Sequence, residues 1–126
     1  MISEKTRASN YKELLVWQKA FALVQAVYEI TGDFPRGERY GLVSQMRRAA
    51  VSIASNIAEG HARKSTREFV QFISTAEGSA AELETQLLLS GTLNFCPQAG
   101  AKSLLSGLEE VQKMLGALRR RLAARC

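Results

Sequence analysis

The apolar residues of this chain recur at alternating steps of three and four positions, which places them on one side of successive α-helices. The first such stripe consists of Leu14, Trp17, Phe21, Val24, Tyr28 and Thr31. It predicts a helix over residues 12–32. The segment GDFPRGERYG then ends this helix, because Pro35 lacks an amide donor and disfavours helical geometry at Phe34.

Three further stripes predict three more helices, over residues 39–60, 66–92 and 97–124. Their members are Leu42, Met46, Ala49, Ala50, Ile53 and Ile57, then Phe69, Ile73, Ala76, Ala80, Leu83 and Leu87, and finally Leu104, Leu108, Val111, Leu115, Leu118 and Leu122. Gly60 is a candidate C-cap, and Pro97 is placed to open the last helix. Ser65 and Glu68 have the spacing of a capping box.

Four helices with short connections predict an all-α fold, an antiparallel up-down-up-down four-helix bundle. A chain of 126 residues suits one such domain, which we place at residues 12–126. The polar segment before it, residues 1–11, is predicted to be disordered.

The second predicted helix contains the segment RRAAVSIASNIAEG, residues 47–60, in which polar residues stand among alanines and isoleucines. One flank of its stripe holds Gln45, Ser52, Asn56 and Glu59, and the other holds Val43, Ala54 and Ala58. A helix that is small or apolar over most of its circumference has more surface to bury than three partner helices cover. The pattern therefore predicts self-association.

Carboxylates beside the third stripe, at Glu77 and Glu84, need partners if they are partly buried. Arg47 and Arg48 of the neighbouring helix are the natural candidates, within one chain or between subunits. We interpret these four residues, with Ser52, Asn56 and Glu59, as groups that set helix register or subunit geometry. The alternative is a role in contacting a ligand or RNA.

Seventeen Lys and Arg residues against twelve Asp and Glu give a formal charge of +5, which favours phosphate polymers or acidic surfaces as partners. Two basic clusters stand out: Arg63, Lys64 and Arg67, and then Arg119, Arg120, Arg121 and Arg125. They predict binding of RNA or DNA through phosphates. No aromatic residue is interleaved with them, so base stacking is not indicated. Their alternative explanations are interaction with a helix dipole and simple solvation.

Enzymatic activity is not expected, because the whole chain contains one histidine, His61, and one aspartate, Asp33. A catalytic triad would have to use these two turn residues without any nucleophile motif nearby. A di-metal helix bundle needs Glu-x-x-His pairs, and Ala58 stands three residues before His61. We therefore expect no catalytic metal and no cofactor, and interpret His61 as a solvated turn residue.

The N-terminal residues are polar and of mixed charge, and no segment approaches the ~18 apolar residues of a membrane span. A cytoplasmic protein is therefore expected. Cys96 and Cys126 do not have a metal-binding spacing, and we expect two reduced thiols.

Several segments together resemble a known family. They are FP at 34–35, YGL at 40–42, QMRRAAVSIASNIAEG at 45–60, STREFVQFI at 65–73 and EGSAAELETQL at 77–87. In this order they are similar to the bacterial 23S ribosomal-RNA intervening-sequence proteins, and to the related accessory variability determinant of diversity-generating retroelements. The resemblance covers residues 11–92 by motif and the fourth helix by pattern.

This resemblance implies a homopentamer of four-helix bundles, arranged as a barrel with a basic surface. For the retroelement branch it also implies binding to nucleic acid and to a reverse transcriptase, and it brings no catalytic residues. The function expected is therefore that of a non-enzymatic, oligomeric nucleic-acid-binding accessory protein. The alternative is a protein-interaction scaffold that docks a polymerase or a reverse-transcriptase-like partner.

Overall fold

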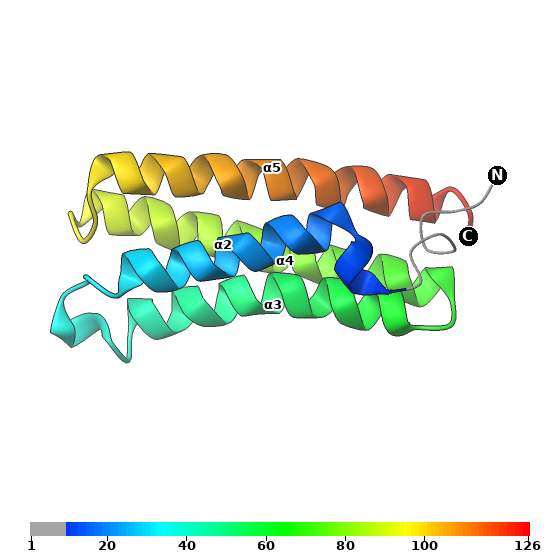
Figure 1. Cartoon of the computed structure of the whole chain (residues 1–126), viewed down its shortest axis with the longest axis horizontal. Helices are drawn as coiled ribbons and strands as arrows, with labels where there is room; N and C mark the ends of the chain where they lie inside the picture. Colours follow the sequence, from blue (N-terminus) through cyan, green and yellow to red (C-terminus); the bar gives the residue numbers. More distant parts are fainter. Residues whose placement is uncertain (1–9) are drawn as a thin grey trace.

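The protein, described here by a computed structural model over residues 10–126, is built from four long α-helices and two short 3₁₀ turns (Figure 1). In chain order the elements are η1 (Tyr11–Glu13), α2 (Leu15–Thr31), η2 (Arg36–Glu38), α3 (Leu42–Ala62), α4 (Thr66–Thr92) and α5 (Gln98–Ala123). At ~1.5 Å per residue, α4 is roughly 40 Å long.

The four helices run side by side with their connections at alternate ends, so that each is antiparallel to the next (Figure 1). Each helix packs against its neighbour in sequence, and α2 also packs against α5, which closes the bundle. The predicted all-α four-helix bundle is confirmed. Among the described residues, no helix is both long enough and apolar enough to cross a membrane.

The core is formed by the stripes predicted for α3, α4 and α5. Every residue of these three stripes is buried, and Met46, Ile53, Ile73, Leu83 and Leu115 are fully so. These helices therefore present to the core the faces that their apolar spacing indicates.

The stripe predicted for α2 is right at its two ends and wrong between them. Leu14, just before α2, and Thr31, its last residue, are buried as predicted. Between them α2 buries Val16, Ala20, Leu23 and Val27, each one position before a predicted residue. Phe21 is 48% exposed and Tyr28 46% exposed, whereas Trp17 and Val24 are half-buried at the edge of the core. Because α2 is apolar around most of its circumference, two overlapping stripes satisfy the helical period, and the slimmer aliphatic one occupies the core.

The chain before α2 forms its own turn, so α2 begins later than predicted. The Asn10 side chain accepts a hydrogen bond from the Lys12 amide at 2.8 Å, and Leu14 is extended. This turn folds Tyr11 against Trp17, with the ring centroids 5.2 Å apart. Of the segment predicted to be disordered, residues 1–9 lie outside the described residues, whereas Asn10 and Tyr11 belong to this turn.

Gly60 does not cap α3, which continues to Ala62 with Arg63 as its C-cap. Gly60 is buried where α3 crosses the start of α4. A Cβ atom added there would lie 2.7 Å from Phe72 Cβ and 2.8 Å from Phe69 Cδ1. Close approach of the two helices, rather than a left-handed cap, therefore explains this glycine. The capping hydrogen bond predicted for α4 does form, from the Glu68 amide to Ser65 Oγ at 3.1 Å.

We expect Gly60→Ala to lower the free energy of unfolding by about 1–3 kcal/mol, because the added methyl group overpacks the α3–α4 crossing. Gly78→Ala is the matched control, since a Cβ atom at Gly78 of α4 would meet nothing within 4 Å. It should raise stability by roughly 0.5–1 kcal/mol through helix propensity. Denaturant unfolding measures both changes, and equal effects of the two substitutions would contradict the proposed crossing.

The α2–α5 contact is the least filled of the four helix pairs. A groove of about 500 Å³ runs between these helices, lined by small residues that include Gly100 and Gly107 as well as by Ile30. The lysine and glutamate at its rim, Lys19 and Glu110, form an exposed ion pair of 3.4 Å. Such an exposed pair adds little stability. Helices α2 and α5 also approach each other less extensively than the other adjacent pairs of long helices do.

Candidate nucleic-acid interface

The two basic clusters predicted from the sequence lie at the same end of the bundle. One is on the α3–α4 connection and the first turn of α4, and the other on the last turns of α5 (Figure 1). We call the surface formed by these residues the basic end: Arg63, Lys64, Arg67, Arg120, Arg121 and Arg125. All six are exposed. The Arg63 guanidinium also lies over the Phe72 ring, 4.7 Å from its centroid.

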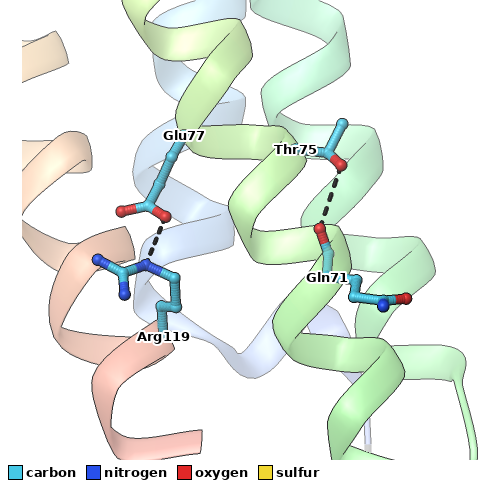
Figure 2. A network of polar contacts seen from close by, with 4 residues as sticks. All are labelled: Gln71, Thr75, Glu77 and Arg119. Atoms are coloured by element: carbon cyan, nitrogen blue, oxygen red, sulfur yellow. Dashed lines mark hydrogen bonds and ion pairs between the residues drawn. The ribbon is translucent and has the colours of Figure 1, made fainter. Parts of the chain in front are cut away.

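Arg119 differs from the other arginines of its cluster, because it faces α4. Its Nε donates to Glu77 Oε1 at 2.6 Å, and both side chains are about one-third exposed (Figure 2). Beside this pair, the Thr75 hydroxyl donates to the Gln71 carbonyl oxygen within α4 (Figure 2). The ion pair joins α4 to α5, so Arg119 acts first as a link between helices.

The predicted pairing of Arg47 and Arg48 with Glu77 and Glu84 does not form within the chain. Glu77 is taken by Arg119, and Glu84 Oε1 accepts a hydrogen bond from Gln112 of α5 at 3.2 Å. The prediction failed because both carboxylates point toward α5, whereas Arg47 points toward α2.

Arg47 holds the C-terminal end of α2 instead. Its Nε donates to Thr31 Oγ1 at 2.9 Å, and its Nη2 donates to the Tyr28 carbonyl oxygen at 3.3 Å. The guanidinium carbon also lies 4.4 Å from the centroid of the Tyr28 ring. A cation at a helix C-terminus offsets the partial negative charge of the last carbonyl groups. Arg48, the next residue, is exposed.

The polar residues that stand among the alanines of α3 divide into two groups. Ser52 and Asn56 are half-buried against α4, where the Ser52 and Ser79 hydroxyls are 2.8 Å apart. Asn56 Nδ2 donates back to the Ser52 carbonyl oxygen at 2.8 Å. Glu59, by contrast, is exposed. Small polar groups at Ser52 and Asn56 thus allow close α3–α4 packing with their hydrogen bonds satisfied.

A third basic site, at the opposite end of the bundle, was missed by the sequence analysis. A cleft of about 1390 Å³ opens where α2 ends, η2 turns and α3 begins. We call it the arginine–tyrosine cleft after the lining residues Arg36, Arg39, Arg47, Arg48, Tyr28 and Tyr40. The signal was present in PRGERYG, residues 35–41, which contributes two arginines and a tyrosine and ends six residues before Arg47.

His61 and the cysteines complete the inventory of reactive groups. His61 lies in the last turn of α3, half-buried and edge-on to the Phe69 ring, so its interpretation as a solvated turn residue is wrong. Both cysteines are free thiols, and partial burial raises the pKa of Cys96 above its usual value. Within residues 10–126, no three His, Cys, Asp or Glu side chains group as a metal site would require.

Comparison with a solved structure supports the fold. The chain superposes on a crystal structure from Bacteroides thetaiotaomicron, described as a protein with unknown function from the S23 ribosomal protein family. The TM-score is 0.76 at 20% sequence identity, with 83% of this chain and 98% of the other covered. At that identity the likeness establishes the shared architecture alone.

Comparison of the amino-acid sequence with known proteins and family models identifies the family of the chain. No curated protein matches the chain. The family model described as 23S rRNA-intervening sequence protein, however, matches residues 12–117, from the η1 turn to within two turns of the end of α5. The chain therefore belongs to the family of 23S ribosomal-RNA intervening-sequence proteins.

Proposed function

We propose that this protein is a non-enzymatic nucleic-acid-binding accessory protein that works as a ring-shaped homo-oligomer, most simply a homopentamer. RNA is its expected ligand, and the contacts are dominated by phosphates. The observation that carries the proposal is the convergence of two basic segments, separated by the whole length of α4 and most of α5, on one end of the bundle (Figure 1).

The basic end has the chemistry of a phosphate-binding surface. Its six exposed cations come from the α3–α4 connection, the first turn of α4 and the end of α5. Lysine and arginine side chains that neutralise phosphates release condensed counterions, which supplies affinity without reading sequence. Arg119 supports this surface through its ion pair with Glu77.

Self-association is supported by two exposed apolar surfaces, although not by the flank of α3 on which we first based it. Val43 and Ala54 of that flank are buried within the chain, and Ala58 is half-buried. One surface, the α2–α3 face, is centred instead on Phe21, 48% exposed, and Val51, 41% exposed. These two side chains line a shared hollow of about 280 Å³, together with the half-buried Trp17 and Val24.

The second surface, the α4 face, runs along the outside of α4. After the first turn of α4, Glu82 is the only charged residue among its exposed positions. Leu88 is 53% exposed, with Leu89 beside it. Three exposed threonines, Thr75, Thr85 and Thr92, donate their hydroxyl hydrogens to the carbonyl oxygen four residues earlier, so less of their surface needs water.

Two different apolar faces on one chain suit a head-to-tail interface. In a two-fold dimer each subunit contributes the same patch, whereas a closed ring joins one patch of each subunit to a different patch of the next. The α2–α3 face and the α4 face supply such a pair, since α2 and α4 lie diagonally in the bundle. The number five rests on the family resemblance.

Assembly would strengthen phosphate binding by multiplicity. Each chain has a formal charge of +5, so five copies together have +25. A polyanion that contacts several copies at once gains avidity without any new kind of contact. Weak contacts at each basic end would then add up to useful affinity.

The test is charge reversal at the basic end. We expect Arg67→Glu/Arg120→Glu to reduce RNA affinity at least about 100-fold at ~50 mM salt, and to flatten the dependence of log K on log salt. Lys102→Glu/Lys113→Glu is the matched control, because these exposed lysines on α5 lie outside both basic sites and their reversal changes the net charge equally. Fluorescence anisotropy gives the affinities, and light scattering checks that the oligomer persists.

Equal loss of affinity in both variants would point to net charge alone rather than to the basic end. Absence of RNA and DNA binding by an intact wild-type oligomer would reject the nucleic-acid function. The basic surface would then be assigned to docking of an acidic or polymerase-like protein partner.

A further inference from the structure

The arginine–tyrosine cleft has a volume of about 1390 Å³, and the charged side chains that line it are all positive. Four arginines line it, and no Asp or Glu of residues 10–126 does. Glu38, which stands between Arg36 and Arg39 in sequence, accepts a hydrogen bond at its Oε1 from the Leu42 amide at the start of α3, at 3.2 Å. The positive charge of the cleft is therefore not neutralised by its own walls.

The arginines of the cleft also lack ion-pair partners elsewhere in the described chain. No carboxylate of residues 10–126 forms an ion pair with Arg36, Arg39, Arg47 or Arg48. Arg47 is fixed by Thr31 and Tyr28, whereas the other three side chains are exposed. Like charges that share a concave surface raise the local positive potential, which an anionic ligand would relieve.

Exposed aromatic rings lie among these charges, whereas Phe72, the ring beside Arg63 at the basic end, is half-buried. Tyr40 is 90% exposed, the highest value of any large hydrophobic side chain described. Tyr28 presents its ring to the same cleft and has the Arg47 guanidinium 4.4 Å from its centroid. Exposed aromatic rings beside cations are the combination on which unpaired bases stack while their phosphates are neutralised.

We propose that the arginine–tyrosine cleft is a binding site for single-stranded nucleic acid, separate from the basic end. This inference rests on the proposed nucleic-acid function and names the form of nucleic acid that this site takes. Arg36, Arg39 and Arg48 contact phosphates, Tyr40 stacks on a base, and Arg47 keeps Tyr28 in place. Bases within a duplex are already stacked on one another and leave no face for Tyr40.

The size of the cleft favours a strand over a mononucleotide. Its volume of about 1390 Å³ exceeds the ~300–1,000 Å³ of typical small-molecule sites. Arg36 and Arg39 lie on the η2 connection and Arg47 and Arg48 on α3, so the charges are spread along the cleft instead of converging on one point. A spread row of cations fits successive phosphates of a chain.

The experiment compares a single strand of about 12 nucleotides with a duplex of the same length, both labelled for anisotropy, on the intact oligomer. We expect Arg36→Glu/Arg39→Glu and Tyr40→Ala each to weaken single-strand binding at least about tenfold and to leave duplex binding unchanged. Tyr40→Phe keeps the ring and should retain wild-type affinity. Lys102→Glu/Lys113→Glu should not discriminate between the two ligands.

The basic-end variant Arg67→Glu/Arg120→Glu separates this inference from the proposed function. If it alone reduces binding of both ligands, and the cleft variants behave as wild type, nucleic-acid binding stands and the cleft inference is overturned. Competition of the single strand by inorganic phosphate or a mononucleotide at equal phosphate concentration would also overturn it, in favour of a small-anion site. If the wild-type protein binds neither oligonucleotide, both the cleft inference and the proposed nucleic-acid function are rejected.

Discussion

Replacing Ile53 by Asp is expected to unfold the chain. Ile53 is fully buried in the middle of α3, within the hydrophobic cluster formed by the core residues of the four helices. An unpaired charge in such a site either remains ionised at a large desolvation cost or takes up a proton. The loss should be about 4–5 kcal/mol or more, much of the ~5–15 kcal/mol of a typical domain.

Two further variants make the result specific to the core. Ile53→Val removes one methylene group and should cost only about 0.5–1.5 kcal/mol. Gln45→Asp introduces the same charge at an exposed position of the same helix, and should leave the unfolding midpoint nearly unchanged. Circular dichroism during urea unfolding measures all three. A stable Ile53→Asp variant would show that α3 does not place this residue in the core.

Charged substitutions on either apolar face are expected to break the proposed ring into single chains that remain folded. Phe21→Arg places a guanidinium in the centre of the α2–α3 face, and Leu88→Arg does the same on the α4 face. Both residues are about half exposed in the single chain, so each change should leave the bundle intact but make burial against a neighbour very unfavourable. Light scattering should fall from the mass of the oligomer to that of one chain, whereas Ser106→Arg on exposed α5 should have no effect.

Mixing the two variants tests the head-to-tail arrangement directly. Each keeps the face that the other has lost, so an equimolar mixture should form one-to-one pairs with a single intact interface and no larger species. An interface made of one self-complementary face would respond to only one of the two substitutions, and mixing would not restore any association. A wild-type protein that is monomeric at micromolar concentration would remove the assembly proposal altogether.

The sequence alone was sufficient for the bundle because in α3, α4 and α5 the large aliphatic residues recur at the helical period along one stripe. All the residues predicted there are buried. Helix α2 was ambiguous, since Phe21 and Leu23 belong to different stripes that both satisfy the helical period. The two stripes differ in side-chain volume, and the one with smaller side chains fits the core. The space that the other helices leave for α2 is not evident from a single sequence.

The site was predicted only in part, for a geometric reason. The two basic clusters are contiguous in sequence, so counting charges found them. The arginine–tyrosine cleft is assembled from the end of α2, the η2 turn and nearly three turns of α3, and its charges come together only when the chain reverses at Pro35. The partners of Glu77 and Glu84 were missed similarly, because their direction depends on how α4 is rotated against α5.

The groove between α2 and α5 has a consequence for how the chain folds and opens. Helices α3, α4 and α5 are joined by short turns and pack in sequence order, so their contacts close small loops and can form quickly. The α2–α5 contact spans most of the chain and is the pair hollowed by Gly100 and Gly107. Helix α2 is therefore expected to be the least strongly packed helix of the bundle. It should pack against the other three helices last during folding, and separate from them first in partial unfolding. Because α2 also carries Phe21 and one wall of the arginine–tyrosine cleft, a neighbouring subunit or a bound strand that holds it in place would slow this opening.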